Sequence, residues 1–159
     1  MPTKSGTFRD ENRRKLVHRI REALKKETPV VEALEKHGLD ESVIDDAQIK
    51  FEPLDVSAKT VDGVIILNDK LLDGEWREIL RYACHEMVHV FQQLTSDVSE
   101  EGNSDYLDQD GEIEAFRTQR KVMEEMYDPA EVQNYIEDLV DHHGLKGKER
   151  LDKIKELAK

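Results

Sequence analysis

With 159 residues, the chain is long enough to form one domain around a buried core, and 38% of its residues are charged. Its formal net charge of −12 would repel nucleic-acid phosphates, so no nucleic-acid partner is expected. No apolar run reaches the roughly 20 residues that span a bilayer, which excludes a membrane protein. No signal peptide is apparent, and Cys84 is the only cysteine. A cytoplasmic protein is therefore expected.

The N-terminal segment has an excess of basic over acidic residues, unlike the rest of the chain. Residues 1–8 are expected to be disordered, residues 10–26 to form an amphipathic helix, and residues 28–37 a second, shorter one with Pro29 in its first turn. Residues 1–27 contain nine Lys/Arg and four Asp/Glu, whereas the rest contains fifteen and thirty-two. The basic helix could contact an acidic partner; alternatively, it packs on its own acidic domain.

The pattern changes in the next part of the chain. QIKFEPLDV (48–56) and TVDGVIILN (60–68) are rich in strand-forming residues, and Pro53 makes the first an edge or irregular strand. Helices, strands and again helices predict an α+β fold, mostly helical with a small sheet. The remaining helices are expected at about 73–94, 110–127, 129–141 and 147–158. A single domain should thus comprise N-terminal helices (9–46), a catalytic core (47–127) and C-terminal helices (128–159).

The sequence His85-Glu86-Met87-Val88-His89 indicates a zinc site. Positions i and i+4 share one face of a helix, so both imidazoles could bind one Zn²⁺ while Glu86 polarises its water. On a helical wheel the apolar residues of 76–94 gather on the face opposite the two histidines. The alternative is an ordinary surface face that happens to hold two histidines, and this helix by itself leaves it open.

A catalytic zinc needs a third protein ligand. Gln92 and Thr95 stand where metzincins need Gly and His, which excludes that class. A later helix offers two carboxylates, Glu112 and Glu114. The wheel puts Glu112 on the apolar, inward face and Glu114 among charged residues facing solvent, so Glu112 is the expected ligand. A salt bridge is the alternative explanation for Glu112.

HEMVHVFQQ (85–93) followed by GEIEAF (111–116) resembles the compact gluzincin-type zincins, or minigluzincins, small phage and bacterial zinc peptidases. The resemblance covers about residues 61–127. It implies a zincin-like fold in which residues 63–68 form the upper edge of the cleft. It also implies that His85, His89 and Glu112 bind one zinc ion and that Glu86 is the general base. Larger gluzincins often have Asp where Phe116 stands, so a carboxylate that orients a ligand histidine must come from elsewhere or be missing.

The expected function is therefore zinc-dependent hydrolysis of peptide bonds in a peptide or protein substrate. Tyr106, Arg117, His142 or His143 could supply a further electrophile, and Tyr106 is the best placed of these, although a packing role is equally compatible. Two rival functions stay open. One is a zinc-binding module without turnover, and the other is a metal-free helical adaptor.

Overall fold

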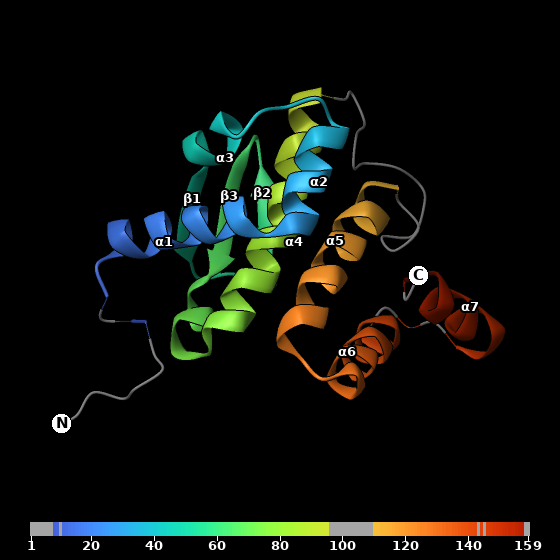
Figure 1. Cartoon of the computed structure of the whole chain (residues 1–159). Helices are drawn as coiled ribbons and strands as arrows, with labels where there is room; N and C mark the ends of the chain where they lie inside the picture. Colours follow the sequence, from blue (N-terminus) through green and yellow to red (C-terminus); the bar gives the residue numbers. More distant parts are fainter. Residues whose placement is uncertain (1–7, 10, 96–109, 143, 145, 158–159) are drawn as a thin grey trace.

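The structure is a computed structural model that describes residues 8–9, 11–95, 110–142, 144 and 146–157. Helices pack beside one small sheet (Figure 1), and the α+β class expected from the sequence is confirmed. The elements in chain order are α1 (Arg13–Lys26), α2 (Thr28–Lys36), α3 (Ser42–Asp46), β1 (Gln48–Glu52), β2 (Ala58–Val61), β3 (Val64–Asn68), the 3-10 helix η1 (Asp69–Asp73), α4 (Trp76–Thr95), α5 (Asp110–Met126), α6 (Pro129–His142) and α7 (Gly147–Leu157).

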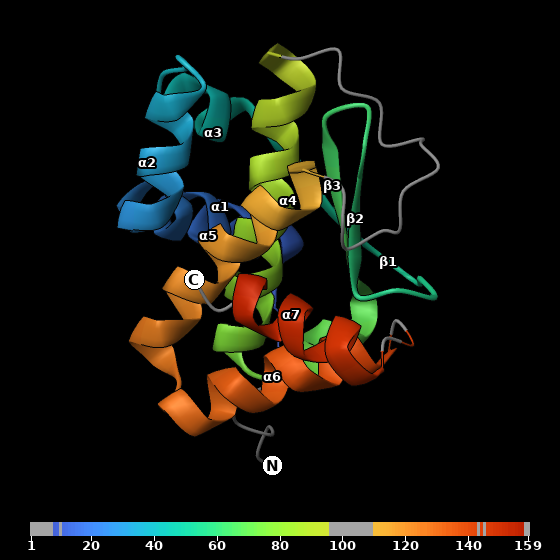
Figure 2. The same ribbon diagram turned by 90° about the vertical axis from the view of Figure 1, so that its right-hand side faces the viewer.

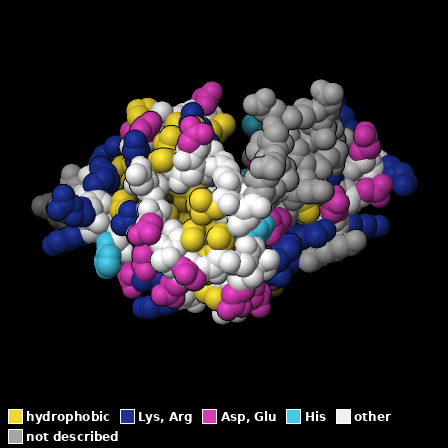
Figure 3. Space-filling model, turned by 90° about the horizontal axis from the view of Figure 1, so that it is seen from above, with side chains coloured by type: hydrophobic (Ala, Val, Ile, Leu, Met, Phe, Trp, Pro, Cys, Tyr) yellow, Lys and Arg dark blue, Asp and Glu magenta, His cyan; other side chains and the backbone are white. Residues whose placement is uncertain are grey.

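Helix α1 begins where Asn12 caps it, because the Asn12 side-chain oxygen accepts hydrogen bonds from the backbone N–H groups of Arg14 and Lys15. Its apolar stripe of Leu16, Ile20 and Leu24 is fully buried in the main core. Its basic side chains Arg13, Arg14, Lys15 and Arg19 are exposed instead, and Lys and Arg side chains gather at the left of Figure 3. The helix thus packs on its own domain, as one of the two sequence interpretations expected, while an acidic partner for its basic face stays a prediction.

Phe8 corrects the expectation that residues 1–8 are disordered. Its side chain is buried beside Trp76, with ring centroids 6.2 Å apart, and its N–H donates to the Leu72 carbonyl at 2.7 Å. An aromatic side chain stabilises the fold by burial even at the end of a polar segment. The other residues of that expectation, 1–7, lie outside the described part of the chain.

The sheet has the strand order β1-β3-β2, with β1 parallel and β2 antiparallel to β3. Asp62 and Gly63, with φ of 49° and 79°, make the tight turn between β2 and β3. Pro53 follows β1, which is an outer strand as expected. Residues 63–68 do not form the outer strand that the resemblance implied, because β3 is central; β2 is the outer strand that lies against α4.

Helix α4 runs through the middle of the molecule, between the sheet and α5 (Figure 1). Every residue from Ala83 to Gln92 is buried, on all faces of the helix. Helices α6 and α7 pack on each other and on α5, below the sheet in Figure 2, around a second apolar cluster that includes Phe116, Met123 and Ile136. Among the described residues, no helix is long and apolar enough to cross a membrane.

Candidate metal centre

Three side chains from two helices converge in the interior. His85 and His89 lie one turn apart on α4, and Glu112 lies in the first turn of α5. The Nε2 atom of His85 is 2.8 Å from one carboxylate oxygen of Glu112, and the Nε2 atom of His89 is 3.2 Å from the other. Their exposed fractions are 9%, 6% and 6%. The expected trio is therefore brought together, and burial of both imidazoles excludes the alternative of an ordinary surface face.

The other nitrogen of each ring is bound by a glutamine. The Nδ1 atom of His85 is 2.9 Å from the side-chain oxygen of Gln119, and that of His89 is 2.8 Å from the side-chain oxygen of Gln92. An amide oxygen only accepts, so each Nδ1 carries the proton and each Nε2 is directed at the centre. The sequence showed no carboxylate that could orient a histidine of the trio. In the structure, the amides of Gln119 and Gln92 orient the two rings instead.

Charge interactions within the trio are strong. Burial lowers the pKa of His89, but the hydrogen bond and charge of Glu112 outweigh burial and raise that pKa to about 9. Burial raises the pKa of Glu112, but its hydrogen bonds to His85 and His89 outweigh burial and hold the pKa well below its usual value. The Glu112 carboxylate thus favours a positive charge between itself and the two imidazoles. That charge is either an imidazolium, formed when an imidazole binds a proton, or a metal ion that replaces the proton.

The three groups fit a metal ion. One ligand atom from each lies within 4.8 Å of the others, and tetrahedral zinc with bonds of about 2.0–2.1 Å separates neighbouring ligand atoms by about 3.3 Å. The distances of 2.8 and 3.2 Å require only a small opening of the trio. Two imidazoles and one carboxylate also form the ligand set of many catalytic zinc sites. The salt bridge that the sequence left as an alternative is the contact that such an ion would replace.

Glu86 is not one of the converging groups, although it is buried and lines the same pocket. The Thr60 hydroxyl on β2 lies 2.7 Å from one carboxylate oxygen of Glu86 and donates to it. Within the described part of the chain, the second carboxylate oxygen of Glu86 has no hydrogen-bond partner.

Glu114 does not face solvent, which corrects the helical-wheel assignment. Only 20% of its side chain is exposed. One carboxylate oxygen accepts from the amide nitrogen of Gln92 at 2.8 Å, and the other lies 2.9 Å from Nε2 of His37. The wheel describes one helix and its own neighbours, whereas the partners of Glu114 come from α4 and from the end of α2. Glu114 therefore lies outside the converging trio but is connected to it.

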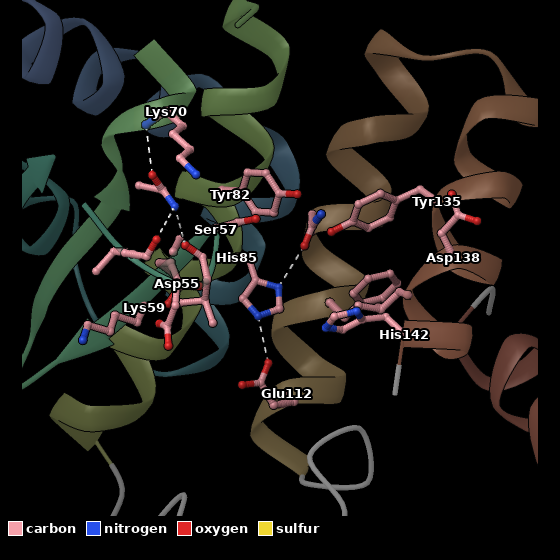
Figure 4. A pocket seen from close by; sticks show the side chains of 18 of the residues that line it. Asp55, Ser57, Lys59, Lys70, Tyr82, His85, Glu112, Tyr135, Asp138 and His142 are labelled. Carbon is pink, nitrogen blue, oxygen red and sulfur yellow. Dashed lines mark hydrogen bonds and ion pairs between the residues drawn. The ribbon is translucent and has the colours of Figure 1, made fainter. Parts of the chain in front are cut away.

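A pocket of about 1100 Å³ opens over the centre (Figure 4). In this view His85 and Glu112 lie between the segment around Ser57 and helix α6, which contributes Tyr135 and His142. The apolar and aromatic side chains lining it are Leu54, Val56, Ala58, Tyr82, Phe116, Tyr135, Leu139 and Leu157. The pocket is thus built partly by residues 128–157, which lie outside the region of the family resemblance.

The four candidate electrophiles fall in different places. His142 lines this pocket. Arg117 instead borders a second, smaller pocket between α2 and α5. Tyr106 and His143 lie outside the described residues, so the expectation for Tyr106 stays a prediction.

Sequence reasoning missed Gln119 and Thr60. Gln119 follows Glu112 by seven residues, a spacing that returns to the same helical face and could have pointed to it. No sequence signal marks Thr60, because its contact with Glu86 depends on how the sheet packs against α4.

Searches for a matching protein family, a similar curated protein and a similar solved structure found no match to the chain.

Proposed function

We propose that the chain is a zinc-dependent metallopeptidase, with His85, His89 and Glu112 as the ligands of one zinc ion. One observation carries the proposal. Both imidazoles have Nδ1 committed to a glutamine oxygen, and both direct Nε2 at the same buried carboxylate. A buried group of acceptors that converge without a cation would be costly. A ligand set of this composition, next to a pocket, supports a catalytic ion more than a structural one.

Zn²⁺ bound in such a site supplies Lewis-acid activation of water and of a carbonyl oxygen. Glu86 is the proton carrier in our proposal. Its carboxylate takes a proton from the attacking water at the oxygen that Thr60 leaves open, and returns it to the leaving amine. Thr60 holds the other oxygen, so the carboxylate keeps one orientation while it exchanges the proton.

Peptide or protein substrates fit the surroundings of the site. The pocket is largely apolar and aromatic, with Asp55, Lys59, Lys70 and Asp138 among its polar residues. The outer strand β2 lies beside it, and an extended peptide can add to such a strand through main-chain hydrogen bonds. This part of the proposal draws on the family resemblance as well as on the site. A cytoplasmic location stays a prediction.

A single set of measurements tests the proposal. Protein purified without chelators in zinc-supplemented medium should contain about one zinc per chain. It should also cleave an unfolded protein such as reduced casein, and a chelator should abolish that cleavage. Zinc at one equivalent without chelator-sensitive cleavage would favour a zinc-binding module, and no bound metal would favour the metal-free adaptor and refute the proposal.

A further inference from the structure

A chain of polar contacts leads away from the metal centre toward the N-terminal helices. The amide nitrogen of Gln92 donates to the Gly111 carbonyl at 2.9 Å and to Glu114 at 2.8 Å. Both of these partners only accept, so the amide group of Gln92 can face them only with its nitrogen. Its oxygen is thereby turned to Nδ1 of His89. A flipped amide would present N–H to N–H and lose both the His89 contact and the Glu114 contact.

His37 fixes the far end of this chain. It is the C-terminal cap of α2, and its Nε2 is 2.9 Å from Glu114. Its Nδ1 is 3.0 Å from the hydroxyl oxygen of Thr95, whose proton goes to the Phe91 carbonyl. Both ring nitrogens of His37 therefore face acceptor oxygens, which fix the orientation of the ring. The ring also packs near Phe91, with centroids 6.4 Å apart.

We propose that Glu114, anchored by His37, is a positioning residue of the metal centre that acts through the amide of Gln92 on His89. The inference rests on the proposed metal site and extends it to a helix outside the motif region. Glu114 does not itself touch the trio; it holds the Gln92 oxygen toward Nδ1 of His89, which keeps Nε2 available for the metal. Removal of groups that orient ligand histidines typically costs about 10–100-fold in metal affinity.

The test is metal affinity, measured with Zn²⁺ alone on metal-free protein by competition with a chromophoric chelator. Glu114→Ala should weaken binding by about tenfold, at the lower end of the range for outer-sphere groups. Glu114→Gln should restore most of the affinity, because its side-chain oxygen can still accept from Gln92. Glu35→Ala is the matched control, since it removes an exposed carboxylate on α2 close to His37 and should leave affinity unchanged.

A double-mutant cycle separates positioning from a general effect on the fold. Gln92→Leu removes the amide through which Glu114 acts, so adding Glu114→Ala to it should cause no further loss of Zn²⁺ affinity. The absorption bands of bound Co²⁺ should change in Glu114→Ala and Gln92→Leu but not in Glu35→Ala. If Glu114→Ala does not fold, His37→Phe replaces it in the cycle, because phenylalanine keeps the ring packing and removes both donors.

Each outcome decides between the two proposals. Affinity in Glu114→Ala equal to that of Glu35→Ala would overturn the positioning role and leave the metal site standing. The positioning role would also be overturned if Glu114→Ala lowered Zn²⁺ affinity equally in the unaltered protein and in Gln92→Leu, since Glu114 would then act by another route. If the unaltered protein binds no Zn²⁺, the metal site itself fails, and the positioning role fails with it.

Discussion

Replacing Glu112 with Gln tests the metal centre most directly. Glutamine keeps the shape of the side chain, which is buried between two helices, and removes its charge. The two carboxylate oxygens of Glu112 face Nε2 of His85 and of His89 at 2.8 and 3.2 Å. The substitution therefore removes the only negative charge of the trio. In the metal-free protein, the amide can still donate to a neutral imidazole, and the fold should therefore survive.

The expected size follows from the number of ligands. Zinc sites with four ligands have apparent binding free energies of about 10–16 kcal/mol near pH 7, or roughly 2.5–4 kcal/mol per ligand. Loss of the carboxylate should thus weaken Zn²⁺ binding by about 10²–10³-fold, since 1.4 kcal/mol corresponds to tenfold. That loss exceeds the tenfold expected for Glu114→Ala, so Zn²⁺ affinity should fall further in Glu112→Gln than in Glu114→Ala.

The assay is Zn²⁺ competition with a chelator of known affinity, with circular dichroism of the metal-free protein as the control for folding. A second readout is the ring-proton NMR titration of His89 in the metal-free protein. Glu112 raises the pKa of His89 to about 9 against the effect of burial, so in Glu112→Gln this histidine should titrate at a lower pH. Zinc affinity within threefold of the unaltered protein, in a folded variant, would refute the assignment of Glu112 as a ligand.

Four further changes address the remaining features. Glu86→Gln should keep one zinc per chain and lower the rate of casein cleavage by about 10²–10⁴-fold; loss of zinc along with activity would mean that Glu86 is a ligand. Thr60→Val should lower kcat with little change in zinc affinity, and Thr60→Ser should restore it; equal kcat in both variants would argue against the contact with Glu86. Burial, and then the charge of Glu125, raise the pKa of Glu27 to about 7. The folded state therefore binds this proton more tightly than the unfolded state does, and the free energy of unfolding falls as pH rises from about 4.5 through 7. Glu27→Gln should therefore raise the free energy of unfolding at pH 8, by up to about 1 kcal/mol after allowance for solvent screening, with no gain near pH 4, as measured by urea unfolding at the two pH values. Ile20→Ala should cost about 2–5 kcal/mol in the same assay because the side chain is fully buried; a cost below 1 kcal/mol would mean that α1 is not part of the core.

The sequence predicted the parts of the site that depend on a single helix. Two histidines four residues apart must share a face of α4, and Glu112 lies on the apolar face of α5, as its neighbours indicated. The assignment of Glu114 to solvent was wrong although it used the same wheel. Charged neighbours on one helix indicate a polar face, but they do not reveal that the end of α2 packs against that face and supplies His37.

Local rules also predicted most of the elements. The spacing of apolar residues, the Pro29 start of α2 and the Asp62-Gly63 turn depend on backbone geometry and nearest neighbours, which the sequence contains directly. The strand order β1-β3-β2 was not available in this way. Strand order depends on which backbone groups pair across distant segments, and for that reason β3 was expected at the edge that β2 occupies.

The sequence by itself therefore determined the residue types of the trio, their spacing along two helices and the α+β composition of the fold. Only the tertiary structure decided that both helices meet with the trio buried, that Gln119 and Gln92 fix the two imidazoles, and that Thr60 reaches Glu86. The physical reason is that ligand spacing within a helix is set by its periodicity, whereas the partners of a ligand are set by packing between elements. Orientation of the histidines, and with it the chemistry of the site, belongs to the second kind of information.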